Sequence, residues 1–254
     1  MPDETSAFVA EALRSRGFEV NVLPESDAKS ADLLASKDGE AFVIEVKVKT
    51  DDPARAQKID SELQAGQLVR EVDQVLPRNT IAGVVRHGVE QLEASAQGDP
   101  IRLLWFMSMG VRGHLYSDQI EKTLLGPTLL IDLLETSFQM QCYFFYESSF
   151  FRWRNQLDGA VVAHSKGLKL CVNPFAPRAQ RLRLSSLADI FGSAVLDPPV
   201  LEAEGEACIA DCNLDRSQSY PVLQYLREKL GRRMLINVDM THMRVSAALS
   251  LLES

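Results

Sequence analysis

Residues 31–49, ADLLASKDGEAFVIEVKVK, constrain the fold more than any other part of the chain. Two segments rich in apolar residues, 31–36 and 41–49, flank a short turn that has an Asp-Gly pair at positions 38 and 39. An Asp-Gly pair between two such segments is typical of a tight β-hairpin. The sequence therefore predicts two adjacent antiparallel strands that meet at this turn.

The second strand of the hairpin has two different faces, because side chains alternate along a strand. One face is wholly apolar and is expected to point into a core: Phe42, Ile44, Val46 and Val48. The other face carries one carboxylate and two ammonium groups, those of Glu45, Lys47 and Lys49. A solvated edge strand with a ladder of Glu and Lys is one explanation. The helix–strand order favours a central strand instead, where charges are costly unless they are paired or bound to a metal.

That order is read from apolar periodicity. A helix at 6–16 and a strand at 18–23 precede the hairpin, and helices at 56–76 and 81–97 and a buried strand at 99–110 follow it. Further along we expect helices near 116–125, 185–192 and 220–230, strands near 127–134, 141–147 and 233–239, a hairpin around Lys166-Gly167, and a closing helix at 241–252. The predicted organisation is an α/β core over 1–115 with an α+β C-terminal extension over 116–254.

The hairpin also brings chemistry together. Asp32, on the first strand, can supply a second carboxylate beside Glu45. Two carboxylates with a nearby backbone carbonyl suit Mg²⁺, which prefers oxygen ligands. Such an ion polarises a phosphodiester and helps to generate hydroxide from a bound water. Lys47, on the same face, can stabilise the charge that develops on the phosphate.

Ala31-Asp32, followed after twelve residues by Glu45-Val46-Lys47, resembles the signature of the PD-(D/E)xK superfamily, the restriction-endonuclease-like nucleases. The resemblance covers about the first 110 residues and implies a core of a helix, a three-strand antiparallel meander, a helix and a strand. It implies that Asp32, Glu45 and the Val46 carbonyl bind Mg²⁺, for which Mn²⁺ can substitute, and that Lys47 is the catalytic lysine. Ala31 stands where the family motif has proline.

The resemblance implies two more site residues. Many members have a glutamate on the first helix that faces the site; Glu4 and Glu11 both qualify, and we prefer Glu11 because it lies well inside the predicted helix. Several members carry a polar residue on the helix that follows the motif strand, a position that Gln91 would fill. Lys49 either holds a neighbouring phosphate or lies in water at the end of the strand.

A basic segment in the second half of the chain is the expected route for nucleic acid. Residues 152–183 contain seven Lys and Arg against Asp158 alone, together with Trp153 and Phe175. Cations neutralise phosphates and aromatic rings stack on bases, so Arg152, Arg154, Arg181 and Arg183 are expected to guide the backbone toward the carboxylates. The alternative is that these aromatic residues belong to the core and that the cations extend from it to solvent.

The overall charge sets the remaining expectations. The net charge of −8 argues against an indiscriminate nucleic-acid coat protein but leaves room for a carboxylate-rich nuclease. We expect a metal-dependent nuclease that acts on DNA rather than RNA, with a catalytically inert nuclease-like binding module as the alternative. The sequence has no apolar run long enough to span a membrane and no secretory signal, so the expected location is the cytoplasm. A homodimer is a further expectation.

Overall fold

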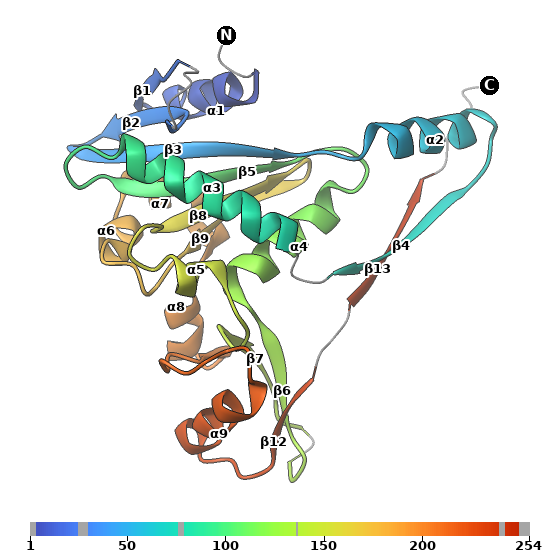
Figure 1. The fold of residues 1–254 in the computed structure, drawn as a ribbon, viewed down its shortest axis with the longest axis vertical. Helices are drawn as coiled ribbons and strands as arrows, with labels where there is room; N and C mark the ends of the chain where they lie inside the picture. The colour runs from blue at the N-terminus through green and yellow to red at the C-terminus, as the bar shows by residue number, and fades with distance from the viewer. Residues whose placement is uncertain (1–3, 25–29, 76–78, 136, 239–241, 249–254) are drawn as a thin grey trace.

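The computed structural model describes residues 4–24, 30–75, 79–135, 137–238 and 242–248. It has a mixed α/β architecture built on one large sheet and two smaller ones (Figure 1). The helices are α1 (Glu4–Arg14), α2 (Pro53–Gln64), α3 (Asn79–Ser95), α4 (Gly113–Leu125), α5 (Ser149–Arg152), α6 (Ala179–Arg183), α7 (Ser186–Phe191), α8 (Pro198–Ala203) and α9 (Ser219–Leu230), with a 3-10 turn at Gly192–Ala194.

The large sheet has seven strands in the order β1-β2-β3-β5-β8-β9-β10. These strands are β1 (Glu19–Val22), β2 (Leu33–Lys37), β3 (Glu40–Lys49), β5 (Ile101–Ser108), β8 (Gly159–His164), β9 (Gly167–Val172) and β10 (Val195–Leu196). The first three form an antiparallel meander, and β5 then pairs parallel to β3. Strand β3 thus has a neighbour on both edges and is central, as its sequence context predicted.

The hairpin predicted from the Asp-Gly pair is confirmed. Strands β2 and β3 pair antiparallel, and Asp38 and Gly39 both adopt positive φ angles, 51° and 80°. Two successive residues with positive φ form the turn whose twist matches that of paired strands. Asp tolerates this conformation and Gly adopts it at no steric cost, so the pair fixes the register of the hairpin.

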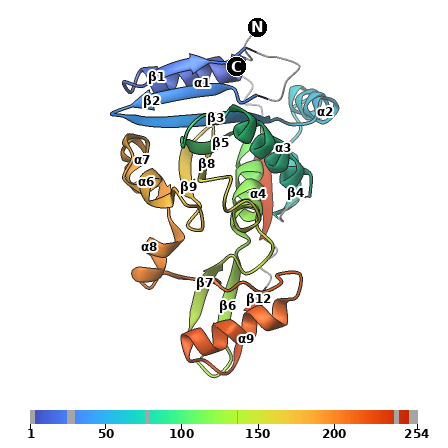
Figure 2. The same ribbon diagram turned by 60° about the vertical axis from the view of Figure 1, so that its left-hand side comes forward.

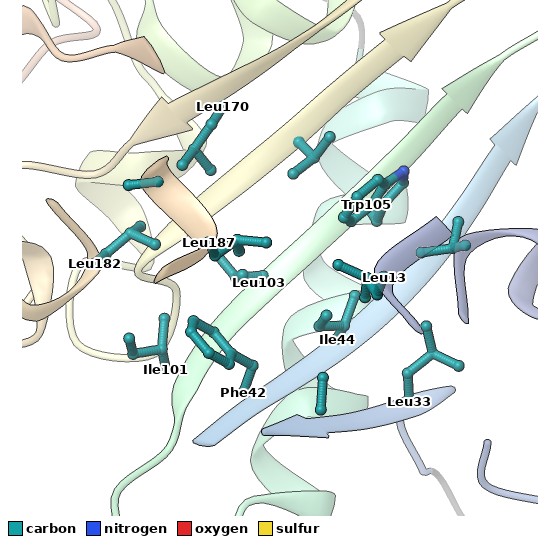
Figure 3. Close-up of a cluster of buried hydrophobic side chains, with 14 of the residues drawn as sticks. Leu13, Leu33, Phe42, Ile44, Ile101, Leu103, Trp105, Leu170, Leu182 and Leu187 are labelled. Atoms are coloured by element: carbon teal, nitrogen blue, oxygen red, sulfur yellow. The ribbon is translucent and has the colours of Figure 1, made fainter. Parts of the chain in front are cut away.

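Each face of the large sheet has its own core. On one face α1, α6 and α7 pack against apolar side chains that include Phe42, Ile44, Leu103 and Trp105. Figure 3 shows these four residues converging with Leu13 of α1 and with Leu182 and Leu187 from α6 and α7. On the opposite face α3, α4 and α5 cover Val43, Leu104 and Phe106. Val48 departs from the expected pattern, because it is 39% exposed where β3 leaves the core.

A smaller four-stranded sheet carries its own core. Its strands have the order β11-β7-β6-β12, and they are β6 (Thr128–Asp132), β7 (Gln139–Tyr143), β11 (Ala207–Ile209) and β12 (Leu235–Val238). Helix α9 packs on this sheet through Val222, Leu223 and Leu226. Figure 2 shows the sheet and α9 below the seven-stranded sheet.

Two expected helical regions are wrong in part. The helix predicted over 56–76 ends at Gln64, Gly66 follows with a φ of 72°, and Val69–Val75 forms strand β4. The helix predicted over 241–252 is strand β13, His242–Ala248, as far as it is described. β4 and β13 pair antiparallel along seven residues, and this long-range pairing overrides the local helical pattern. Figure 1 shows this ribbon and α2 to the right of the main sheet.

The expected boundary at residue 115 does not coincide with a structural division. Strands β8, β9 and β10 come from the predicted extension, yet they complete the seven-stranded sheet next to β5. A core ending at residue 115 would leave β5 as an exposed parallel edge, which is unfavourable because parallel strands are normally buried. Among the described helices, none is long and apolar enough to cross a membrane.

Candidate active site

Asp32 and Glu45 meet where the β2–β3 pairing ends. The last paired residues are Leu33 and Ile44, and Asp32 lies one residue before β2 begins. The Val46 amide, which has no β2 residue opposite it, donates to Asp32 Oδ2 at 2.8 Å. The Asp32 carboxylate therefore takes the place of the next backbone acceptor on β2 in the hydrogen-bond ladder. This bond to Val46 holds the carboxylate beside Glu45.

Glu45 is the most constrained charged group of the site. Its side chain is 2% exposed, and Oε2 is buried without a hydrogen-bond partner. Burial raises the pKa of Glu45 from 4.5 to about 7; the Lys47 ammonium lowers it in part, and the nearby Asp32 carboxylate raises it again. A buried carboxylate oxygen without a donor is costly, and a bound cation would compensate for that cost.

The Lys47 side chain links strand β3 to helix α3. Its Nζ lies 2.5 Å from Glu45 Oε1 and donates to Gln91 Oε1 at 2.8 Å. The Lys47 side chain is 22% exposed, whereas that of Glu45 is 2% exposed. The structure brings Gln91 to the site. Its side chain contacts Lys47 and the backbone carbonyl of Ser30.

Helix α3 approaches β3 closely at Gly88. A Cβ atom on this residue would lie 2.5 Å from Leu104 Cδ2, 3.5 Å from Lys47 Cε and 3.6 Å from Glu45 Cγ. An added Cβ would therefore press on the Leu104 side chain of β5, whereas it would make ordinary van der Waals contacts with Lys47 and Glu45. The absence of a side chain lets α3 cover the site at the distance at which Gln91 reaches Lys47.

The donor set fits a hard divalent cation. The N–H and C=O groups of one strand residue point to the same edge, so the Val46 carbonyl faces the same side as the Asp32 carboxylate. Two carboxylates and one carbonyl give oxygen donors only, which suits Mg²⁺ and Mn²⁺ with water completing the shell. Within the described ranges no cluster of three or more His, Cys, Asp or Glu side chains forms a metal site, so this ion would depend on the carbonyl and on water.

Glu11 does not join these residues. Helix α1 packs on the face of the sheet that carries Ile44 and Val46, which is opposite to the face of Glu45 and Lys47. The Glu11 side chain is 77% exposed and lies 3.8 Å from Arg14. Glu4 is exposed at the start of the same helix. The expected contribution of the first helix fails because α1 covers the other side of β3.

Lys49 lies further along the same face of β3. Its ammonium is 5.4 Å from the centre of the Tyr116 ring, on helix α4. The Tyr116 hydroxyl donates to Asp51 Oδ1 at 3.0 Å. Lys49 is exposed and remains available for a phosphate next to the one that Lys47 would contact.

Most cations of the basic segment have an acidic partner within 4 Å. Arg181 lies 2.7 Å from Asp99, and Arg183 Nη2 donates to Asp197 at 3.0 Å. Both arginines belong to α6, whose Leu182 packs on the face opposite to Glu45. The structure therefore does not place Arg181 and Arg183 where they could guide a backbone into the carboxylates.

Arg152 and Arg154 lie elsewhere. Arg152 is 63% exposed, 3.8 Å from Glu147, and it lines a cavity of about 510 Å³ that also contacts Arg86 and Trp153. Arg154 stacks over the Phe151 ring at 4.8 Å. The neighbouring residues Phe150 and Trp153 pack on the side of the sheet that carries α3, the side of Glu45 and Lys47.

Sequence reasoning missed two residues, Ser30 and Ser95, that connect α3 to the chain before Asp32. Gln91 Nε2 donates to the Ser30 carbonyl at 3.1 Å, and the Ala31 amide donates to Ser95 Oγ at 2.7 Å. The one signal in the sequence is that Ser95 follows Gln91 by four residues and so shares its helix face.

Comparison of the chain with protein-family models, with curated proteins and with solved structures gives no match.

Proposed function

We propose that this protein is a metal-dependent nuclease that hydrolyses phosphodiester bonds, with DNA as the preferred substrate. The observation that carries the proposal is the buried Glu45 carboxylate, which has one oxygen without a partner and lies beside Asp32 and Lys47. A purely structural strand gains nothing from this arrangement, because it is unfavourable to place a half-buried carboxylate beside a buried one. The order α1, β1–β3, α2, β4, α3, β5 contains the elements that the resemblance to the restriction-endonuclease-like family implies, with α2 and β4 inserted between β3 and α3.

The side chains divide the work. Asp32 and Glu45, with the Val46 carbonyl, would hold Mg²⁺ or Mn²⁺, which polarises the phosphodiester and lowers the pKa of a bound water. The Lys47 ammonium, oriented by Gln91, stabilises negative charge on the reacting phosphate. Lys49 lies two residues further along the strand, about 7 Å away, and binds the next phosphate.

Cleavage of labelled DNA and RNA, with Mg²⁺, Mn²⁺ or EDTA, tests the proposal. We expect metal-dependent cleavage by the wild type and a loss on the order of 100-fold or more in Lys47→Ala. Lys58→Ala is the matched control, because Lys58 is an exposed lysine on α2 and 3.8 Å from Glu62. Absence of cleavage by the wild type, with no binding of Mn²⁺ in calorimetry, would contradict the proposal.

The second candidate is a nuclease-like module that binds but does not cleave. Two observations favour it: the net charge of −8 and the neutralised cations of α6. Calorimetry distinguishes the two candidates, since only the enzyme requires a divalent ion at Asp32 and Glu45. Mn²⁺ binding that is lost in Asp32→Asn would favour the enzyme.

A further inference from the structure

The peptide group between Ser30 and Ala31, one residue before the Ala31–Asp32 peptide, is held at both of its polar atoms by helix α3. The Ser30 carbonyl accepts from Gln91 Nε2 at 3.1 Å, and the Ala31 amide donates to Ser95 Oγ at 2.7 Å. These two atoms belong to the same peptide bond. Gln91 and Ser95 are one helical turn apart and therefore project from the same side of α3.

Among the residues that the structure describes, no strand pairs with this peptide group. Strand β2 begins at Leu33, and its pairing with β3 begins at Leu33 and Ile44. A buried backbone N–H or C=O without a partner destabilises the folded chain. In a sheet the two atoms of one peptide group point to opposite edges, so α3 provides two bonds that strands on both sides would otherwise supply. The segment that leads into Asp32 is therefore oriented by a helix rather than by the sheet.

The Asp32 residue itself is held by two further hydrogen bonds. The Asp32 carbonyl accepts from the Leu23 amide at 2.8 Å, and Oδ2 accepts from the Val46 amide at 2.8 Å. With the preceding peptide fixed as well, the backbone at Asp32 is held on both sides. The same Gln91 side chain contacts Lys47, so one turn of α3 sets the position of Lys47 and of Asp32 together.

We propose that Ser95 is a positioning residue: it fixes the Ser30–Ala31 peptide and thereby aims the Asp32 carboxylate at the metal position beside Glu45. The proposal rests on the proposed nuclease function only for the metal. The orientation of Asp32 itself can be measured without any ion, because Val46 donates its amide proton to the carboxylate.

The test compares amide hydrogen exchange and Mn²⁺ binding in wild type, Ser95→Ala and Ser95→Thr. In metal-free protein, Ser95→Ala should exchange the Val46 and Ala31 amides about 5-fold faster, the effect of weakening one hydrogen bond. Its Mn²⁺ affinity in calorimetry should fall about 10-fold, as for residues that orient metal ligands. Ser95→Thr keeps the hydroxyl and should restore both values.

Ser61→Ala is the matched control, because the Ser61 hydroxyl is exposed and bonds only within α2, at 2.8 Å from the Lys58 carbonyl. Ser95→Cys, which offers only a weak acceptor, replaces the alanine variant if that variant does not fold. Unchanged exchange at Val46 overturns the inference, whatever the metal result. Faster exchange at Val46 supports it, and if the wild type then binds no Mn²⁺, the nuclease proposal fails while the positioning role of Ser95 stands.

Discussion

At the residue scale, the energetics of the site depend on Glu45. Its carboxylate is almost completely buried, and only one of its oxygens has a hydrogen-bond donor. Most buried charges in proteins are paired or bound to a metal. Without a cation, the folded protein can reduce the cost by keeping the Glu45 carboxyl protonated, which is the physical meaning of its raised pKa.

This raised pKa predicts how stability depends on pH in metal-free protein. Between pH 4.5 and about 7 the unfolded chain releases the Glu45 proton and the folded chain retains it. The contribution to the free energy of unfolding is therefore full below pH 4.5 and is lost as the pH rises through about 7. Glu45→Gln has no such loss and should be more stable than the wild type at pH 8, by up to about 3 kcal/mol.

Urea unfolding in EDTA at pH 5 and at pH 8 measures this difference. The advantage of Glu45→Gln should be small at pH 5 and largest at pH 8. An identical pH dependence of the two proteins would show that Glu45 titrates as an ordinary carboxyl. Asp60→Asn is a suitable control, because Asp60 is exposed on α2.

At the scale of elements, the site depends on how closely α3 lies against β3 and β5. Gly88 and Gly83 are both within α3, but their surroundings differ. A Cβ at Gly88 would lie 2.5 Å from Leu104 Cδ2, whereas a Cβ at Gly83 would meet no atom within 4 Å. The two glycines thus separate helix propensity from packing at the site.

Gly88→Ala is expected to destabilise the protein by about 1–3 kcal/mol, the usual cost of overpacking, and to reduce metal-dependent cleavage. Gly83→Ala should stabilise it by up to about 1 kcal/mol, because alanine is the better helix former. Thermal unfolding and the cleavage assay measure both variants. Equal effects of the two substitutions would contradict a close approach of α3 at Gly88.

At the scale of the whole molecule, the seven-stranded sheet joins the two halves of the chain. A charged cluster contributes to this union: Arg178 contacts Asp99, before β5 in the first half, and Asp158, just before β8, at 2.8 Å each. Within the second half, Arg183 on α6 contacts Asp197, next to β10. The basic segment thus serves the assembly of the sheet.

Arg183→Gln and Arg181→Gln test this assignment as a pair. Asp197 is 5% exposed, so losing its arginine should cost about 2 kcal/mol, because a buried charged acceptor loses its donors. Arg181 pairs with the exposed Asp99, and its loss should cost less than about 1 kcal/mol. Neither variant should change the salt dependence of DNA binding. A flatter salt dependence of DNA binding in either variant would contradict this assignment and show that the arginine contacts phosphate.

The sequence by itself determined the hairpin, the central position of β3 and the proximity of the Asp32 and Glu45 carboxylates. These follow from side-chain alternation and from an Asp-Gly turn, which are properties of a short stretch of chain. The order of helices and strands in the first 50 residues was also determined locally, whereas Gln91 was suggested by the family resemblance alone.

Only the tertiary structure decided which distant segments meet. The β4–β13 pairing, the bond between Ala31 and Ser95, and the contact of Arg181 with Asp99 all join residues far apart in sequence. Glu11 fails as a site residue for the same reason, because a local pattern fixes the face of a helix but not the side of the sheet on which it packs. Which helices, strands and side chains contact one another depends on the packing of the whole chain, and the periodicity within one element does not determine it.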